Sequence, residues 1–235
     1  MCELTHGGWQ PVFVHAPVPD MKKHPGAVVF DMDGLLFDSE ALYRDAFLDA
    51  ASELGHPLTT EDFLNLVGRS WLVNRVVLQG HIGSFESVEK FRRAWMQHYE
   101  GKRPGLPLKA GAVRLLNLLD ELRLPRAICT SSSHEDVEHN LSLHGLTSRF
   151  DAIVASGDYT RGKPAPDPFI RAAGMLKVAP AVCLALEDSF NGIRAAVAAG
   201  MRTVMVPDLL QPTDEIRELC EFVAVDLHEV CERLG

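Results

Sequence analysis

Two aspartates, one residue apart, follow a short apolar run: Asp31 and Asp33 come directly after residues 27–30. The run has the composition of a buried β-strand, and side chains two residues apart on a strand point the same way. Two neighbouring carboxylates repel unless a cation or a shared proton lies between them. The pair therefore indicates Mg²⁺ binding or acid–base chemistry. Taken alone, the motif is equally compatible with a strand end and a polar turn, where Asp and Gly are common.

A second apolar run ends in hydroxyl groups, because Thr130 and Ser131 follow residues 126–129. Hydroxyls and free backbone N–H groups at a strand-to-helix junction suit phosphate oxygens. The alternative is a helix N-cap, which the same residue types supply.

A third segment, residues 161–168, places Lys163 among three prolines. Because the prolines stiffen the loop, they hold Lys163 on a rigid arm. Asp167 before Pro168 has the pattern of an N-cap and a first helical residue, so we expect Asp167 to be structural.

The fourth segment repeats the first pattern: Glu187 and Asp188 follow the apolar residues 181–186. Two acids after a fully apolar run are costly to place near a core without a partner. A hard cation is a suitable partner, since it binds carboxylate oxygens. Asp188 or Ser189 could instead cap the helix that follows.

In this order, the four segments resemble the motifs of the haloacid dehalogenase superfamily of phosphotransferases. The sequences that carry the resemblance are Asp-Met-Asp-Gly-Leu-Leu-Phe-Asp-Ser-Glu at 31–40, Gly-Lys-Pro-Ala-Pro-Asp at 162–167 and Glu-Asp-Ser-x-Asn-Gly-Ile at 187–193. They are similar to the subgroup that contains β-phosphoglucomutase and sugar-phosphate phosphatases. The resemblance covers nearly all of the chain from about residue 27 onward.

The resemblance implies a role for each aspartate of the first motif. Asp31 would attack the phosphorus of a monoester and become an aspartyl phosphate. Asp33 would protonate the leaving alkoxide and then activate water. An acid–base aspartate of this kind argues against a haloacid dehalogenase, which does not need one.

The resemblance also implies the remaining site. Mg²⁺ would be held by the Asp31 carboxylate, the Asp33 backbone carbonyl and Asp188, with Glu187 contributing directly or through water. Lys163 would offset the negative charge, and Thr130 with the Ser131 N–H would hold the phosphoryl oxygens. The expected partner is a small phosphate monoester.

Composition narrows the function classes. The chain has 235 residues, a net charge of −9 and no basic stripe, which argues against nucleic-acid binding. The five cysteines form neither a disulfide framework nor a metal-ligand spacing, which favours a reducing, cytoplasmic setting. No apolar stretch is long enough for a membrane span. We expect a monomer or weak dimer, and a loosely ordered leader over residues 1–26.

Strand-like runs at 27–30, 126–130, 151–155, 181–186, 203–206 and 222–225 alternate with helical patterns. This alternation predicts an α/β fold with a Rossmann-like parallel sheet. Ligands in such sheets bind at the carboxyl ends of the strands, where all four motifs fall or adjoin.

Between the first two runs the sequence shows helical patterns and no convincing strand, over a stretch too long for an ordinary connection. It predicts an inserted helical domain, which the resemblance identifies as a cap. The expected division is a core of 27–41 and 109–235 with a cap of 42–108. The predicted cap helices present three apolar faces: Leu42, Ala46, Phe47, Ala50 and Leu54; Leu72, Val76 and Val77; and Phe91, Trp95 and Tyr99.

Two cap residues bear on the reaction. The β-phosphoglucomutases carry a histidine ten residues after the second aspartate, and here Tyr43 stands at that position. This departure favours hydrolysis over phosphoryl relocation, with a mutase as the alternative. Arg69, in the predicted loop 67–71, is the candidate for substrate specificity, and a plain surface position is the other interpretation.

A signalling function is the distant alternative. Receiver domains also combine an aspartate cluster, a strand ending in Thr or Ser and a Lys-Pro loop, and they accept phosphate on aspartate. They are about half as long and lack a helical insertion after the acidic strand, so the insertion argues against this class.

Overall fold

We analysed a computed structural model of the 235-residue chain, which describes residues 24–67 and 71–235. Six parallel strands form one sheet in the order β3-β2-β1-β4-β5-β6. The strands are β1 (Ala27–Phe30), β2 (Arg126–Cys129), β3 (Ala152–Val154), β4 (Cys183–Glu187), β5 (Arg202–Met205) and β6 (Phe222–Val223). The predicted α/β fold with a parallel sheet is therefore confirmed, and every predicted strand is present.

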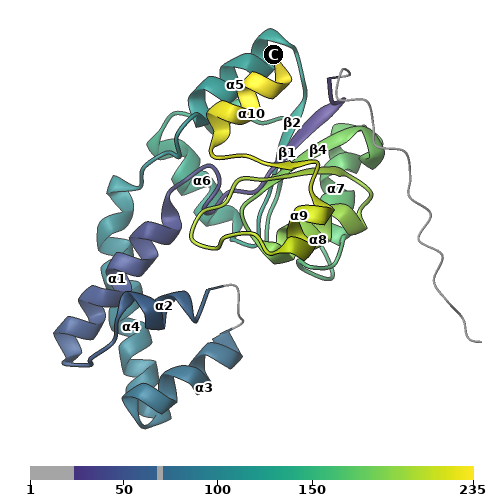
Figure 1. The fold of residues 1–235 in the computed structure, drawn as a ribbon. Coiled ribbons are helices and arrows are strands. Elements are labelled where there is room, and N and C mark those ends of the chain that lie inside the picture. The colour runs from purple at the N-terminus through teal and green to yellow at the C-terminus, as the bar shows by residue number, and fades with distance from the viewer. Residues whose placement is uncertain (1–23, 68–70) are drawn as a thin grey trace, which may run out of the picture.

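Helices cover both faces of the sheet (Figure 1). One face packs against α5 (Ala112–Glu121), α6 (His134–Leu143) and α10 (Leu227–Leu234) in a core that contains Phe30 and Ile128. The other packs against α7 (Asp167–Leu176) and α8 (Phe190–Ala198) around Val29 and Cys129. A short α9 (Asp214–Leu219) adjoins α8. Strand residues alternate between the two cores, as the two-residue period of a strand requires.

Between β1 and α5 the described part of the chain forms four α-helices beside the sheet, which we call the insertion helices (Figure 1). They are α1 (Ser39–Leu54), α2 (Thr60–Leu64), α3 (Trp71–Ile82) and α4 (Phe85–Lys102), followed by a 3₁₀ turn at Arg103–Gly105. Further 3₁₀ turns lie at Thr147–Arg149 and Pro180–Val182. Because Pro180 starts the last turn, β4 begins at Cys183, two residues later than the pattern predicts.

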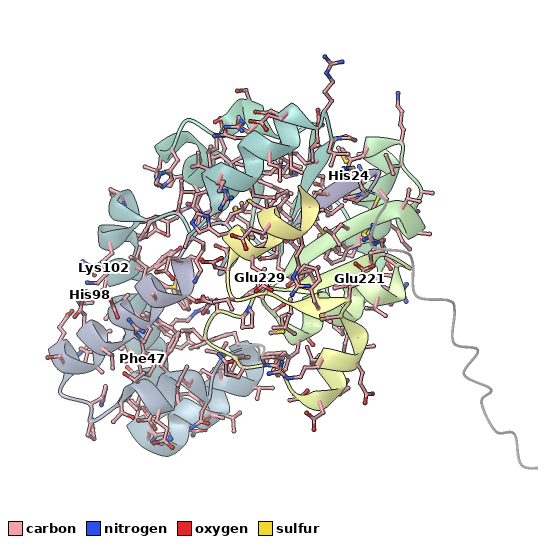
Figure 2. All side chains as sticks on the ribbon, turned by 45° about the horizontal axis from the view of Figure 1, so that its top comes forward. His24, Phe47, His98, Lys102, Glu221 and Glu229 are labelled. Atoms are coloured by element: carbon pink, nitrogen blue, oxygen red, sulfur yellow. The ribbon has the colours of Figure 1, made fainter. Side chains whose placement is uncertain are left out.

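The insertion helices have a hydrophobic core of their own, built around Phe47, Phe63, Phe91 and Trp95. Two ion pairs tie α4 to α1: His98 lies 2.7 Å from Glu53, and Lys102 lies 2.7 Å from Asp49. Figure 2 shows Phe47 inside the insertion, with His98 and Lys102 at its edge. The predicted domain boundaries at 41/42 and 108/109 stay a prediction, and α1 runs across the first of them.

The predicted apolar face of α3 is wrong at Leu72 and Val76, whereas Val77 packs against the insertion core as predicted. Leu72 and Val76 are 71% and 60% exposed, whereas Leu78 of the same helix is buried. The helix packs against α4 through the face that contains Leu78. Valine and leucine on a short helix do not identify the buried side when apolar residues occur all around it.

In the described residues, no helix is long and apolar enough to cross a membrane. The predicted leader, 1–26, lies outside them except for its last three residues.

Candidate active site

The carboxylate of Asp31 lies at the carboxyl end of the central strand β1. Its backbone N–H donates to the Leu186 carbonyl at 3.0 Å, and the residue is only 7% exposed. Burial raises the pKa of Asp31 to about 8; the Lys163 ammonium opposes this shift, and the negative charges of Glu187 and Asp33 add to it. A buried carboxyl in this position needs a positive partner to remain ionised at neutral pH.

Lys163 supplies one such partner. Its Nζ donates to Asp31 Oδ1 at 2.5 Å, to Glu187 Oε1 at 2.5 Å and to the Cys129 carbonyl at 2.9 Å. Burial alone would lower the pKa of Lys163, but the two carboxylates raise it well above its ordinary value. All three donors of the ammonium are used, so the lysine joins the ends of β1, β2 and β4.

The loop that carries Lys163 contains an ion pair at the surface, in which Arg161 lies 2.7 Å from Asp167. Pro166 is the N-cap of α7, so Asp167 is its first residue and the predicted N-cap role of Asp167 is wrong. The carboxylate accepts hydrogen bonds from the Arg161 side chain at 3.2 Å and 2.7 Å.

Glu187 is fully buried at the end of β4. Its Oε2 accepts hydrogen bonds from Ser189 Oγ at 2.9 Å and from the Ser189 N–H at 3.2 Å. Gly192, in the first turn of α8, lies against this carboxylate so closely that a Cβ there would be 1.9 Å from Glu187 Cδ. Glycine therefore allows the helix start to reach Glu187.

Asp31, Glu187 and Asp188 form a candidate metal centre, because one oxygen from each lies within 4.8 Å of the others. Burial and the charges of Asp31, Glu187 and Glu40 raise the pKa of Asp188 well above its ordinary value. Three crowded carboxylates with one lysine carry excess negative charge. Carboxylate oxygens are the ligands that Mg²⁺ prefers, so this donor set fits the ion that the sequence predicts.

Asp33 is turned toward the loop after β2. Ser132 Oγ donates to Asp33 Oδ2 at 2.6 Å, and Thr130 Oγ1 lies at the hydrogen-bond limit of 3.5 Å from the same oxygen. Thr130 Oγ1 also accepts a hydrogen bond from the Ser132 N–H at 3.0 Å. Sequence analysis missed Ser132, although the hydroxyl run at 130–133 contains the signal.

A pocket of about 550 Å³ lies between the sheet and the insertion helices, and neither Glu187 nor Ser132 is on its wall. The predicted residues on its wall are Asp31, Asp33, Thr130, Ser131, Lys163 and Asp188. A second pocket of about 380 Å³ shares Asp33, Ser131 and Glu40 with the first and continues to Tyr43 and Tyr99. Pockets of this size accept small organic molecules.

Glu40 lines both pockets and was missed by sequence analysis. Burial, together with the charges of Asp33 and Asp208, raises the pKa of Glu40 to about 7. The available signal was its place as the last residue of the 31–40 motif, in the first turn of α1. Sequence alone could not show that this turn faces the pocket.

Comparison with known proteins agrees with this geometry. Residues 25–200 match the family model of the haloacid dehalogenase-like hydrolases. The chain belongs to that family. It is 37% identical over 186 residues to a probable pseudouridine-5'-phosphatase of Drosophila melanogaster, with coverage of 77% of this chain and 80% of that one.

Two further likenesses place this haloacid dehalogenase-like hydrolase among its relatives. It is 34% identical over 194 residues to the Arabidopsis thaliana protein SUPPRESSOR OF QUENCHING 1, chloroplastic, covering 78% of this chain but only 18% of that longer protein. A β-phosphoglucomutase-like structure from Thermotoga maritima has a TM-score of 0.76 and 26% identity, covering 88% of this chain and 97% of the other. The predicted superfamily is thereby confirmed, and the phosphatases among the relatives agree with a phosphoric monoester hydrolase.

Of the two candidate specificity residues of this hydrolase, the structure describes only Tyr43. Tyr43 packs against Trp95 with ring centroids 4.4 Å apart, and its hydroxyl lies 3.3 Å from Met96 Sδ. It lines the second pocket but belongs mainly to the insertion core. Arg69 lies outside the described residues, so its role stays a prediction.

The close approach of Gly192 to Glu187 generates a stability prediction. Gly192→Ala should lower the free energy of unfolding by about 1–3 kcal/mol, because the added methyl overlaps the buried carboxylate. The measurement is equilibrium unfolding in urea. Gly174→Ala in α7 is the matched control: nothing lies within 4 Å of its Cβ position, so it should be neutral or stabilising by about 0.5–1 kcal/mol. Equal effects of the two substitutions would contradict the prediction.

The raised pKa of Glu40 generates a pH prediction for the metal-free protein. Its carboxyl ionises near pH 4.5 in the unfolded chain and near pH 7 in the folded one. The folded state then binds more protons between these values, so its contribution to stability is complete below pH 4.5 and lost as pH rises through 7. Glu40→Gln should remove this loss.

The check is urea unfolding in EDTA near pH 5 and near pH 8. The stability gained by Glu40→Gln relative to wild type should grow between the two, by up to ~3 kcal/mol. Glu86→Gln is the matched control, because Glu86 also lies in the first turn of a helix but is exposed. A gain that is the same at both pH values would refute the assignment.

Proposed function

We propose that this protein is a Mg²⁺-dependent phosphatase that hydrolyses a small phosphate monoester, such as a sugar phosphate or a nucleoside monophosphate. The observation that carries the proposal is that oxygens of Asp31, Glu187 and Asp188 lie within 4.8 Å of one another. The Lys163 ammonium donates a hydrogen bond to Asp31, and Asp31, Asp188 and Lys163 line a pocket of about 550 Å³. Membership of the hydrolase family and the phosphatase name of a relative support the substrate class.

In the proposed first step, an Asp31 carboxylate oxygen attacks phosphorus. The new P–O bond forms as the bond to the leaving oxygen breaks, and Asp33 gives its proton to the leaving alkoxide. Thr130 and the Ser131 N–H hold the phosphoryl oxygens at the same edge of the sheet. Such preorganised donors are worth about 3 kcal/mol each in the transition state.

In the second step, Asp33 takes a proton from water, whose oxygen attacks the phosphorus of the aspartyl phosphate. The bond to Asp31 breaks, inorganic phosphate leaves and the carboxylate is restored. Lys163 holds the Asp31 carboxylate in place through its contacts with β2 and β4. Bound at Asp31, Asp188, Glu187 and the Asp33 carbonyl, Mg²⁺ would supply positive charge to offset the phosphoryl oxygens.

The insertion helices complete the proposed substrate site as a cap. Tyr43, Tyr99 and Met96 of α1 and α4 line the second pocket, which joins the first at Asp33 and Glu40. A leaving group of modest size would therefore contact the cap while its phosphate contacts the core. The net charge of −9 favours no polyanionic partner, and a cytoplasmic monomer or weak dimer stays the expectation.

The proposal predicts metal-dependent turnover that requires Asp31. The wild-type protein should release phosphate from an aryl phosphate in Mg²⁺ and lose this activity in EDTA. Asp31→Asn should abolish turnover and leave no phosphorylated protein in mass spectrometry after a reactive phosphodonor is added, because an amide cannot act as the nucleophile. Glu86→Gln is the control for protein preparation and folding, because Glu86 lies in the first turn of α4 and lines neither pocket. Equal rates in Mg²⁺ and EDTA would reject the metal, and phosphate trapped on another residue would reject the nucleophile.

A second prediction separates hydrolysis from phosphoryl relocation. The mutase alternative is favoured by the likeness to the Thermotoga maritima structure, whereas Tyr43 at the position of the mutase histidine favours hydrolysis. The Tyr43 hydroxyl faces Met96 and has a pKa raised chiefly by burial, so it is a poor partner for proton transfer with Asp33.

The protein is incubated with β-glucose 1-phosphate, Mg²⁺ and a trace of the 1,6-bisphosphate, and both products are followed. We expect free phosphate to form and no glucose 6-phosphate to accumulate, because Tyr43 stands where the mutase histidine would withhold Asp33 from water. Rapid glucose 6-phosphate formation with negligible free phosphate would instead establish the mutase.

A further inference from the structure

Asp208 presents an unsatisfied oxygen next to the candidate metal centre. It lies in the loop after β5, and its side chain is 9% exposed. Its Oδ1 accepts a hydrogen bond from Lys109 Nζ at 2.7 Å, whereas its Oδ2 is buried and has no hydrogen-bond partner among the described residues. A buried carboxylate oxygen without a hydrogen-bond donor lowers the free energy of unfolding by about 1–3 kcal/mol or more. We therefore expect this oxygen to have a donor in the functional protein.

The free oxygen lies near Asp188. A Cβ built on Gly34 would lie 2.5 Å from Asp188 Oδ2 and 3.2 Å from Asp208 Oδ2, so both oxygens face the same point above the Asp31 motif. The next two residues, Leu209 and Leu210, line the first pocket, so Asp208 lies beside it. Two carboxylates facing one another without a proton donor between them repel.

Asp208 is nevertheless too far out to be a direct ligand. Among the described residues, the acidic oxygens within 4.8 Å of one another belong to Asp31, Glu187 and Asp188, and Asp208 is not a member of that set. A water molecule bound to a divalent cation is a strong donor that carries positive charge. Mg²⁺ usually keeps several of its waters when carboxylates bind it, so it would present such donors to neighbouring acceptors.

We propose that Asp208 is a positioning residue of the metal site, whose Oδ2 accepts a hydrogen bond from a water bound to the cation held by Asp31, Glu187 and Asp188. This inference rests on the proposed metal-dependent function. It adds to the metal site a residue that belongs neither to the four sequence motifs nor to the direct ligands.

Lys109 sets the direction of the Asp208 carboxylate. Lys109 lies where the segment that enters the insertion helices runs beside the segment that leaves them. The backbone N–H of Lys109 donates to the Leu36 carbonyl at 2.9 Å, and the Asp38 N–H donates to the Pro107 carbonyl at 2.9 Å. Its Nζ also lies 3.4 Å from Asp38 Oδ1. With Oδ1 engaged by this anchored ammonium, Oδ2 is the oxygen left to face Asp188.

The test is the affinity of the full-length protein for Mn²⁺, a stand-in for Mg²⁺ that carboxylate and water ligands also suit. The EPR signal of free Mn²⁺ gives the dissociation constant without any turnover. Asp208→Asn should raise that constant about 10- to 100-fold, as loss of a partner outside the ligand set typically does. Whichever way the amide is turned, its NH₂ group faces either the water or the Lys109 ammonium, and both are donors.

Asp208→Glu separates position from charge. It keeps the negative charge and can still pair with Lys109, but its oxygens lie one methylene farther from the backbone. We expect it to bind Mn²⁺ as weakly as Asp208→Asn. Wild-type affinity in the glutamate variant would show that charge alone matters and would overturn the positioning role.

Two controls keep the outcomes distinct. Glu221→Gln neutralises a carboxylate of similar burial that pairs with Arg202 at 2.6 Å, and Figure 2 shows Glu221 well away from the insertion that carries Phe47. It should leave the dissociation constant within about twofold of wild type. Thermal unfolding in EDTA verifies that each variant is folded.

Asp188→Asn tests the proposed metal site itself. If it abolishes binding while Asp208→Asn binds like wild type, the inference about Asp208 is overturned and the metal site stands. If wild type binds no Mn²⁺, or if Asp188→Asn binds it unchanged, the metal site of the proposed function is rejected and the role of Asp208 with it.

Discussion

The Lys163 ammonium, buried between two carboxylates, is the interaction on which the site depends. Its contacts to Asp31 and Glu187 at 2.5 Å, and to the Cys129 carbonyl at 2.9 Å, join the ends of three strands. Removing one member of such a group leaves an uncompensated buried charge, which typically costs 3–5 kcal/mol. Three carboxylates still face one lysine, and the remaining negative charge is what makes the site suitable for a cation.

Close backbone approach is the second constraint. Glu187 is fully buried, and it is accommodated because Gly192 has no Cβ and the Ser189 hydroxyl and N–H donate to its carboxylate. Gly34, with a φ of +80°, also lies close to a carboxylate, because a Cβ there would be 2.5 Å from Asp188 Oδ2. Gly34 directly follows Asp33, and Gly192 lies four residues after Asp188 in the same motif. Their role is to let the chain turn against carboxylates that a larger residue would displace.

The insertion helices stabilise themselves and contribute to the site at one edge. Phe47, Phe91 and Trp95 make a core separate from those of the sheet, while Glu40 and Tyr43 reach the pockets from α1. Lys109, just after the insertion helices, donates a hydrogen bond to Asp208 in the loop after β5. The residues that carry the chain to the insertion therefore lie next to the candidate metal centre, and the two pockets adjoin at Asp33 and Glu40.

The sequence alone was sufficient for the order of strands along the chain, the insertion and the four motifs, because strand periodicity and acidic strand ends are local signals. Every predicted strand is present, and Asp31, Asp188 and Lys163 meet because the carboxyl ends of parallel strands share one edge of a sheet. Only the tertiary structure decided what depends on contacts between distant segments. The buried face of α3, the orientation of Asp33 toward Ser132, the environment of Glu40 and the free oxygen of Asp208 are of this kind. Each is determined by neighbours that lie many residues away, and no pattern within a single segment records which neighbours those are.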